Sequence, residues 1–245
     1  MSIIDINARF GAYPSRHRTS NFEQIAADAV RLGVDQSCIC STTGIFYIDR
    51  EGNRQTIAAA SANPARLVPV ATMNPATSFN AEGAVDEIAA MGGFKLIRFF
   101  PDAQNWPIDF APFVQTIDCL SKLRLPAMIS CTRLGDATQI ARLVAAGLGS
   151  GIPVILEGVT AANLAEALSA MRSCATLYIE MHAVVFAGGL RMIRDAVGAD
   201  RIVFGSGTSA LSLGAAISYI HGSDLTSDEK SKVLGGNAAR LLGLK

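Results

Sequence analysis

The chain has 245 residues, of which half are hydrophobic and 17% are charged, so it can bury one large core and is short for two. Its 21 lysines and arginines equal its 21 aspartates and glutamates, and the net charge of zero gives no electrostatic footprint for nucleic acid or for an anionic membrane surface. We therefore expect a single domain over residues 1–245 that handles a small molecule, with no nucleic-acid partner and no membrane partner.

The sequence shows no signal peptide, no membrane-spanning segment and no disulfide pattern. No apolar run approaches the ~20 residues that span a bilayer, and the N-terminus lacks the basic and apolar regions of a signal peptide. The five cysteines are odd in number, and most lie inside apolar segments, which indicates buried reduced thiols. Without a CxxC pair they predict no zinc site. These features favour a cytoplasmic protein.

Eight short β-branched runs follow one another along the chain, with segments of helical length between them. The runs are IIDINAR (3–9), QSCICST (36–42), RLVPVATMN (66–74), KLIRFFP (95–101), PAMISCT (126–132), PVILEGV (153–159), TLYIEMHA (176–183) and RIVFGSG (201–207). The first helical segment, 20–33, begins with Ser20 and Glu23 in capping-box spacing, and segments 80–93 and 163–171 repeat apolar residues every three or four positions. This alternation predicts an α/β fold, a (β/α)8 TIM barrel.

An open doubly wound sheet is the rival architecture. It is typically marked by GxGxxG between the first strand and the first helix, and the segment there, FGAYPSRHRTSN, has no such pattern. The clustered glycines of AAGLGSGIP (145–153) follow a helix and precede a strand, which is the reverse of a phosphate-binding context. They indicate a helix stop.

The working residues of such a barrel lie at the carboxyl ends of its strands. Polar residues of the expected lumen-facing parity are found there in an uneven distribution: Asp5, Asn7 and Arg9 on the first strand, Arg98 on the fourth, Ser130 with Cys131 and Arg133 beside it on the fifth, Glu157 on the sixth, Glu180 and His182 on the seventh, and Ser206 with Gly207 on the eighth.

Several segments together resemble one known family. They are IIDINARFG at the start, RLVPVATMNP and GFKLIRFFPD in the middle, and GADRIVFGSG followed by VLGGNAARLLGL at the end. These are similar to the amidohydrolase-2 family, whose barrels include aminocarboxymuconate-semialdehyde decarboxylase and pyrone-dicarboxylate lactonase. The resemblance spans essentially the whole chain and implies an amidohydrolase-like barrel.

The resemblance also implies where a metal would be held, and this sequence departs from the family at those places. The family places HxH after strand one, histidines after strands five and six, and an aspartate after strand eight. The matching positions hold Asn7 and Arg9, Ser130, Glu157 and Gly207. Because a guanidinium has no acceptor and carries a fixed positive charge, Arg9 would repel a divalent cation. We therefore expect neither a metal nor another cofactor.

The arginines suggest what the mouth of the barrel binds. Arg9 and Arg98 share the lumen parity, while Arg16, His17, Arg18 and Arg133 lie on mouth loops. Guanidinium groups bind carboxylates in a bidentate manner, so this arrangement predicts a locally basic pocket for a small anionic ligand such as a di-acid or an aromatic acid. The alternative is that Arg9 pairs with Glu157 or Glu180 as a buried ion pair in the place of the lost metal.

Proton-transfer groups follow strands six and seven. Glu157, Glu180 and His182 are the candidate catalytic residues, because a histidine titrates near neutrality and a partly buried glutamate can be tuned toward it. The same three could instead hold a metal on new ligands, or His182 could be structural. Cys131 is a candidate nucleophile without an identified base, and Trp106 is either a lid over the site or a cap on the rim.

Together these residues predict a metal-independent hydrolase or lyase that acts on a small carboxylate. The predicted substrate-binding residues are Asn7, Arg9, Arg98, Ser130, Arg133, Ser206 and Trp106. The alternative is a non-catalytic relative that serves as a binding protein or a partner subunit, because retention of a fold does not imply retention of its function. We expect the chain to form a homodimer.

Overall fold

The computed structural model describes residues 2–14, 16–208 and 210–244, and the side chains of Arg16, His17 and Arg18 lie outside the described part. It forms one sheet in the order β2-β1-β3-β4-β5-β6-β7-β8-β9. The strands are β1 (Ile4–Tyr13), β2 (Arg16–Ser20), β3 (Gln36–Ser41), β4 (Leu67–Thr72), β5 (Leu96–Phe99), β6 (Ala127–Ser130), β7 (Val154–Glu157), β8 (Leu177–Glu180) and β9 (Ile202–Val203).

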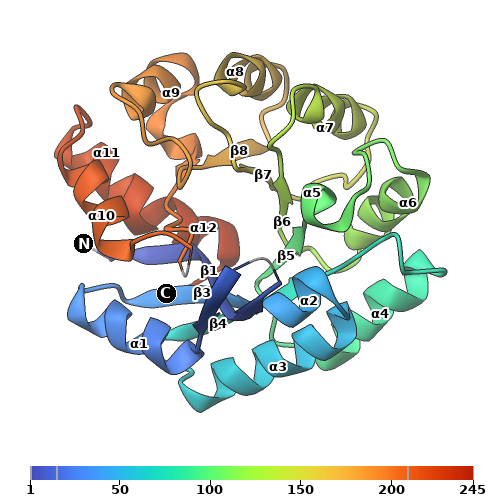
Figure 1. Cartoon of the computed structure of the whole chain (residues 1–245). Coiled ribbons are helices and arrows are strands. Elements are labelled where there is room, and N and C mark those ends of the chain that lie inside the picture. The colour runs from blue at the N-terminus through green and yellow to red at the C-terminus, as the bar shows by residue number, and fades with distance from the viewer. Residues whose placement is uncertain (1, 15, 209, 245) are drawn as a thin grey trace.

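Helices follow the strands and form an outer ring around them (Figure 1). The helices are α1 (Phe22–Arg31), α2 (Thr42–Phe46), α3 (Asp49–Ala62), α4 (Ala81–Met91), α5 (Pro101–Gln104), α6 (Ala111–Leu120), α7 (Asp136–Ala145), α8 (Leu164–Ser173), α9 (Gly189–Val197), α10 (Leu213–His221), α11 (Ser227–Ser231) and α12 (Asn237–Leu242). A short 3-10 helix, Ala199–Arg201, precedes β9, and one π-helical turn, Lys232–Gly236, precedes α12.

The sheet closes on itself between its first and last parallel strands. The backbone N–H of Ile6 on β1 donates to the carbonyl of Phe204 at 3.1 Å, and that of Arg9 donates to the carbonyl of Thr208 at 2.6 Å. Ala8 and Thr208 also form a parallel bridge. Strands β1 and β3 to β9 therefore make the predicted (β/α)8 barrel, and all eight fall within the predicted runs or begin in them.

One strand was not predicted. β1 continues past Arg9 to Tyr13 and pairs with β2 as an antiparallel hairpin, with Gly11 opposite Ser20. Gly11 has a φ of +109°, a conformation that side chains rarely adopt. The segment expected as a plain loop is thus a β-extension above the barrel, and α1 begins after Asn21, whose side chain accepts from the N–H of Gln24. The predicted cap at Ser20 is wrong by one residue.

Alternate positions on the strands pack into two different apolar layers, as parallel barrel strands require. Residues such as Ile97, Ile129 and Leu156 belong to the large cluster that includes the outer helices. Their neighbours in sequence, including Leu96 and Met128, belong to a second cluster, which consists mostly of strand residues and also includes Ala238 and Leu242 of α12. Among the described residues, no helix is both long enough and apolar enough to cross a membrane.

Candidate functional site

Six polar side chains from four strands meet in the barrel lumen at the carboxyl ends of the strands. Asn7 and Arg9 come from β1, Arg98 from β5, Glu157 from β7, and Glu180 with His182 from the end of β8; we call these six residues the lumen cluster. Four of them are at most 2% exposed, whereas the Arg9 and His182 side chains keep 18% and 16% of their surface. Arg9 and His182 are thus the members that a ligand from solvent would meet.

Glu157 is held by two arginines. Its Oε1 lies 2.8 Å from Arg98 Nη2 and also accepts from Arg9 Nη2. Both guanidinium groups lie over the ring of Phe100, with their central carbons 4.7 Å (Arg98) and 5.4 Å (Arg9) from its centroid. Burial alone would raise the pKa of Glu157, but Arg98 and Arg9 reverse that effect and hold it well below the usual range. Glu157 is therefore a fixed anion and not a proton donor at neutral pH.

Glu180 and His182 form a second charged pair. Glu180 Oε2 contacts His182 Nδ1, and Glu180 Oε1 accepts from the backbone N–H of His182 at 2.7 Å. Burial lowers the pKa of the His182 imidazole, but the Glu180 carboxylate outweighs burial and raises it above its ordinary value. With Nδ1 directed at a carboxylate, Nε2 is the ring nitrogen left for other partners.

Asn7 joins these two pairs. Its Nδ2 lies 3.0 Å from Glu180 Oε2 and 3.2 Å from Glu157 Oε1, and its Oδ1 accepts from Arg98 Nη1 at 2.9 Å. Asn7 is completely buried in this structure, so its predicted role as a substrate-binding residue stays a prediction and its observed partners are protein groups.

A layer below the lumen cluster, Asp5 bonds to Ser206. Asp5 Oδ2 accepts from Ser206 Oγ at 2.6 Å, and Asp5 Oδ1 accepts from the Ser206 backbone N–H at 2.9 Å. Burial raises the pKa of Asp5 despite these bonds. Ser206 is 1% exposed, so it supports the closure of the barrel and does not line the mouth as predicted.

The mouth is less basic than the sequence indicated. Arg98 is 1% exposed and paired with Glu157, so it does not meet solvent as a substrate-binding residue would. Arg133 is about half exposed, and its Nε lies 2.5 Å from Asp102 Oδ1, on α5. The alternative in which Arg9 pairs with Glu157 is therefore the observed arrangement.

Three other predicted residues fall in different settings. Trp106 is 2% exposed and packs on Phe113, with ring centroids 4.8 Å apart, so it is not a lid. Cys131 is fully buried, and burial raises the pKa of its thiol, which contradicts its reading as a nucleophile. Ser130 is partly exposed and stands in register beside Glu157, which keeps it at the mouth.

The lumen cluster does not suit a divalent cation. Ligand atoms of Glu157, Glu180 and His182 lie within 4.8 Å of one another, which is close enough for a shared ion. However, Glu157 Oε1 is already paired with two guanidinium groups, and His182 Nδ1 already contacts Glu180 Oε2. The nearby fixed charges of Arg9 and Arg98 would oppose a cation.

The last barrel strand, β9, is followed by a glycine in place of a carboxylate ligand. At Gly207, where the resemblance implies an aspartate, φ is +68° and an added Cβ would lie 3.0 Å from His182 Cδ2. A residue with a side chain at this position would be strained at this φ and would press against the imidazole ring and Leu211. The absence of a side chain at Gly207 therefore leaves the space that the His182 ring occupies.

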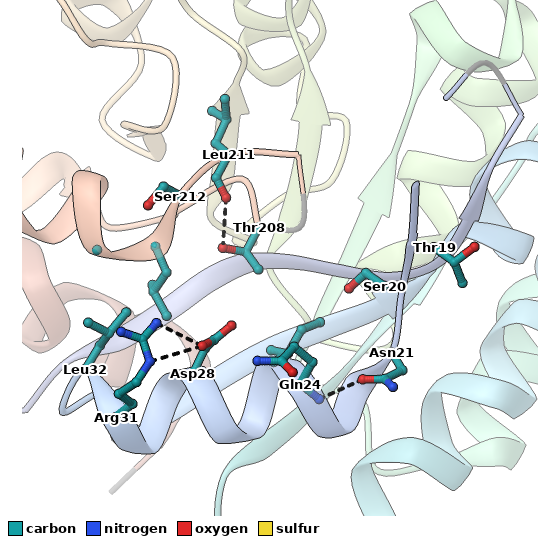
Figure 2. A pocket seen from close by; sticks show the side chains of 13 residues that line it. Thr19, Ser20, Asn21, Gln24, Asp28, Arg31, Leu32, Thr208, Leu211 and Ser212 are labelled. Carbon is teal, nitrogen blue, oxygen red and sulfur yellow. Dashed lines mark hydrogen bonds and ion pairs between the residues drawn. The ribbon is translucent and has the colours of Figure 1, made fainter. Parts of the chain in front are cut away.

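A separate cavity of about 450 Å3 lies between α1 and a wall formed by Thr208 and residues 211–214 (Figure 2). Several of its polar side chains already have partners: Arg31 pairs with Asp28 at 2.9 Å, and Asn21 caps α1. Its lining contains no member of the lumen cluster. The cavity is therefore distinct from the candidate site.

Comparison with known proteins places this barrel in a family. The amidohydrolase family model Amidohydro_2 matches residues 48–244, well over half of the chain. The chain belongs to the amidohydrolase family. The matched range begins after β1, so Asn7 and Arg9 lie outside it. A search of curated proteins found no match to this sequence.

Solved structures with the same fold share little sequence with this amidohydrolase. One is 5-carboxyvanillate decarboxylase from Sphingomonas paucimobilis, with a TM-score of 0.78 and 15% identity over 100% of this chain and 99% of that one. Another is 2,6-dihydroxybenzoate decarboxylase from Rhizobium, with a TM-score of 0.75 and 15% identity over 99% and 98% of the two chains. A third is 5-carboxyvanillate decarboxylase from Novosphingobium aromaticivorans, solved with manganese and 4-hydroxy-3-methoxy-5-nitrobenzoic acid, with a TM-score of 0.74 and 14% identity over 99% and 96%.

Sequence reasoning missed two members of the site's surroundings. Phe100, which lies under both guanidinium groups, reads in sequence as one more apolar residue of its strand. Asp102 on α5, which pairs with Arg133, reaches that residue only in the folded chain. The signal that the sequence does contain is the position of this acidic residue directly after FFP, at the carboxyl end of a predicted strand.

Proposed function

We propose that this amidohydrolase is a metal-independent hydrolase or lyase that acts on a small carboxylate bound at the carboxyl-terminal mouth of the barrel. One observation carries the proposal: His182, oriented by the buried carboxylate of Glu180, and Arg9 are the two partly exposed members of the lumen cluster. An anion-binding group and a proton-transfer group thus stand together where solvent reaches the lumen.

The charge of the lumen cluster supports an anionic ligand. With His182 protonated, Arg9, Arg98 and His182 supply three positive charges against the two negative charges of Glu157 and Glu180. The surplus of one charge matches a monoanionic carboxylate. Arg9 Nε is buried and has no hydrogen-bond partner among the described residues, so this guanidinium retains a donor beyond its pairing with Glu157.

His182 would handle the proton. Because Glu180 holds Nδ1, Nε2 is free to give or take a proton at the mouth, in the manner of other carboxylate-oriented histidines. In a decarboxylation, the bond from a ring carbon to the carboxyl group breaks, its electron pair remains on that carbon, CO2 leaves, and a proton from Nε2 takes the vacant position. In the hydrolysis of a lactone, Nε2 would instead accept a proton from the water that attacks the carbonyl carbon, and would pass it to the ring oxygen as the bond between that oxygen and the carbonyl carbon breaks.

The related structures favour the lyase and an aromatic acid. Their names describe decarboxylases of 5-carboxyvanillate and 2,6-dihydroxybenzoate. At these identities the likeness shows the fold alone, so the reaction and the substrate class are proposals for this chain. The homodimer and the cytoplasmic location stay predictions of the sequence.

A non-catalytic binding protein or partner subunit is the second candidate. One observation favours it: Glu157 takes both lumen guanidinium groups, so that much of the positive charge is already neutralised within the protein. Such an ion pair can fill a former metal site without any chemistry.

The test combines ligand-dependent stability with turnover. The purified protein is treated with a chelator and screened by thermal unfolding against benzoate, 2,6-dihydroxybenzoate, vanillate and isophthalate, and each acid is then followed for loss of CO2 or ring absorbance. An acid present at 100 times its Kd adds about 2.7 kcal/mol to the free energy of unfolding. Arg9→Met should abolish that gain, whereas the matched surface variant Arg31→Met should keep it.

The outcomes separate the candidates. Stabilisation with turnover that His182→Gln removes supports the enzyme. Stabilisation without turnover supports the binding protein. If none of the acids stabilises the wild-type protein, or if turnover requires an added metal, the proposal is overturned.

A further inference from the structure

Asn7 occupies the centre of the lumen cluster, and the orientation of its amide is determined by its neighbours. Arg98 Nη1 lies 2.9 Å from one amide atom of Asn7, and a guanidinium can only donate hydrogen bonds. The atom facing Arg98 is therefore the oxygen. The NH2 group must then face the opposite side, where the two carboxylates lie.

The NH2 group of Asn7 lies between two carboxylates on adjacent strands. Nδ2 is 3.2 Å from Glu157 Oε1 and 3.0 Å from Glu180 Oε2, so its two hydrogens satisfy one oxygen of each. Without a donor between them, the two buried negative charges would repel each other. The amide thus keeps Glu157 and Glu180 in place side by side.

Glu180 Oε2, the oxygen held by Asn7, is also the oxygen that contacts His182 Nδ1. The position of this oxygen decides which ring nitrogen carries the proton in the neutral imidazole. Asn7 Nδ2 also lies 3.2 Å from His182 Nδ1, and two N–H donors do not bond to each other, so this proximity leaves Glu180 as the acceptor for Nδ1.

We propose that Asn7 is a positioning residue: its amide, oriented by Arg98, fixes the Glu180 carboxylate so that His182 carries its proton on Nδ1 and turns Nε2 toward the mouth. The contacts alone support the position of the proton on Nδ1. That this tautomer serves catalysis depends on the proposed function. Asn7 acts through Glu180 and touches no substrate, since it is completely buried.

The experiment reads the imidazole directly and needs no substrate. The chain has three histidines, so a protein labelled with 15N in its histidine rings gives few signals, and the His182 signals are those that disappear in His182→Gln. The 15N shifts report which nitrogen is protonated, and their pH dependence gives the pKa. Two variants are compared, Asn7→Asp, which keeps the size of the side chain, and Asn7→Ala.

Asn237→Asp is the matched control. Asn237 is also buried and also donates both amide hydrogens, to the carbonyls of Ala199 at 2.9 Å and Ile202 at 2.8 Å, away from the lumen cluster. The control should lose stability as the Asn7 variants do while leaving the His182 signals unchanged. A purely structural role for Asn7 would give the same result in both.

In the wild-type protein we expect neutral His182 to be protonated on Nδ1. Asn7→Asp replaces the NH2 group by an oxygen, so the side chain can donate at most one hydrogen, and only when protonated; Glu180 then loses the fixed donor that Asn7 supplied, and the pKa of His182 should shift by about one unit or more, a tenfold change in its proton affinity. Asn7→Ala should release Glu180 and give a mixture of the two neutral forms. Unchanged His182 signals in both folded variants would overturn the proposal.

The wild-type protein decides the matter if the Asn7 variants do not fold. A neutral His182 with its proton on Nε2 refutes the proposal, and one with its proton on Nδ1, together with slowly exchanging amide hydrogens on Asn7, supports it. Failure of the proposed function would be seen separately, as an absence of acid binding and turnover, while these ring signals remained as expected.

Discussion

Removal of the Glu157 charge is the perturbation that most strongly tests the charge arrangement in the lumen. Glu157→Gln keeps the shape of the side chain but leaves the guanidinium groups of Arg98 and Arg9 without their shared counter-ion. Glu157 and Arg98 are 2% and 1% exposed, so solvent cannot replace the lost charge at that pair. Arg9 is more accessible, and its share of the loss is correspondingly smaller.

The expected magnitude follows from this burial. Removing one partner of a buried ion pair costs about 3–5 kcal/mol, because the other charge stays buried and uncompensated. For a chain of this length, each kcal/mol lowers the melting temperature by about 2–4 °C, which predicts a decrease of about 6–20 °C.

The assay is denaturant unfolding of Glu157→Gln beside a surface control. Asp28→Asn removes an ion pair with Arg31, whose side chain is 67% exposed, and should cost no more than about 1 kcal/mol. The double variant Arg98→Met, Glu157→Leu should recover part of the loss, since it leaves fewer unpaired charges. If Glu157→Gln is no less stable than Asp28→Asn, the buried charge of Glu157 does not stabilise the lumen.

Further predictions concern pH, metal ions and thiols. Because the pKa of His182 is raised from 6.5, its contribution to stability is complete below that value and is lost as pH rises through the higher folded value; His182→Gln should flatten this alkaline limb of a stability profile. The depressed pKa of Glu157 predicts a contribution present above 4.5 and lost as pH falls below it, which Glu157→Gln should remove. Dialysis against manganese or zinc should change the melting temperature by less than about 1 °C, since ligand binding to the folded state would raise it by more; a larger rise would count against the fixed-charge site. A thiol reagent should label the partly exposed Cys119 in the native protein and leave buried Cys131 unmodified until unfolding, and equal labelling of both would show that the burial is wrong.

The fold was predictable because each barrel strand carries a local signal. Runs such as KLIRFFP and PVILEGV are short, apolar and β-branched, and the helical periodicity between them requires no knowledge of distant contacts. The β1–β2 hairpin was not predicted, because its second strand, Arg16–Ser20, is polar and lacks the alternation of apolar and polar residues that marks a half-buried strand.

The site was predictable in its membership and less so in its pairings. The parity of β1 and the carboxyl end of β7 were enough to place Arg9 and Glu157 in one lumen. Their contact joins residues 148 apart, and which of Glu157 and Glu180 takes Arg9 depends on strand tilt and register, which the sequence does not state. The contacts of Asn7 with Glu157, Glu180 and Arg98 depend on the same strand tilt and register.

Diffraction from crystals grown with 2,6-dihydroxybenzoate and excess manganese is the most direct test of the central claim that fixed guanidinium charges occupy the place of a metal. We expect a carboxylate bonded to Arg9 beside His182, with the ion pair of Arg98 and Glu157 intact and no anomalous peak of manganese among Glu157, Glu180 and His182. A fully occupied manganese ion on those three residues, with Arg9 displaced, would contradict it.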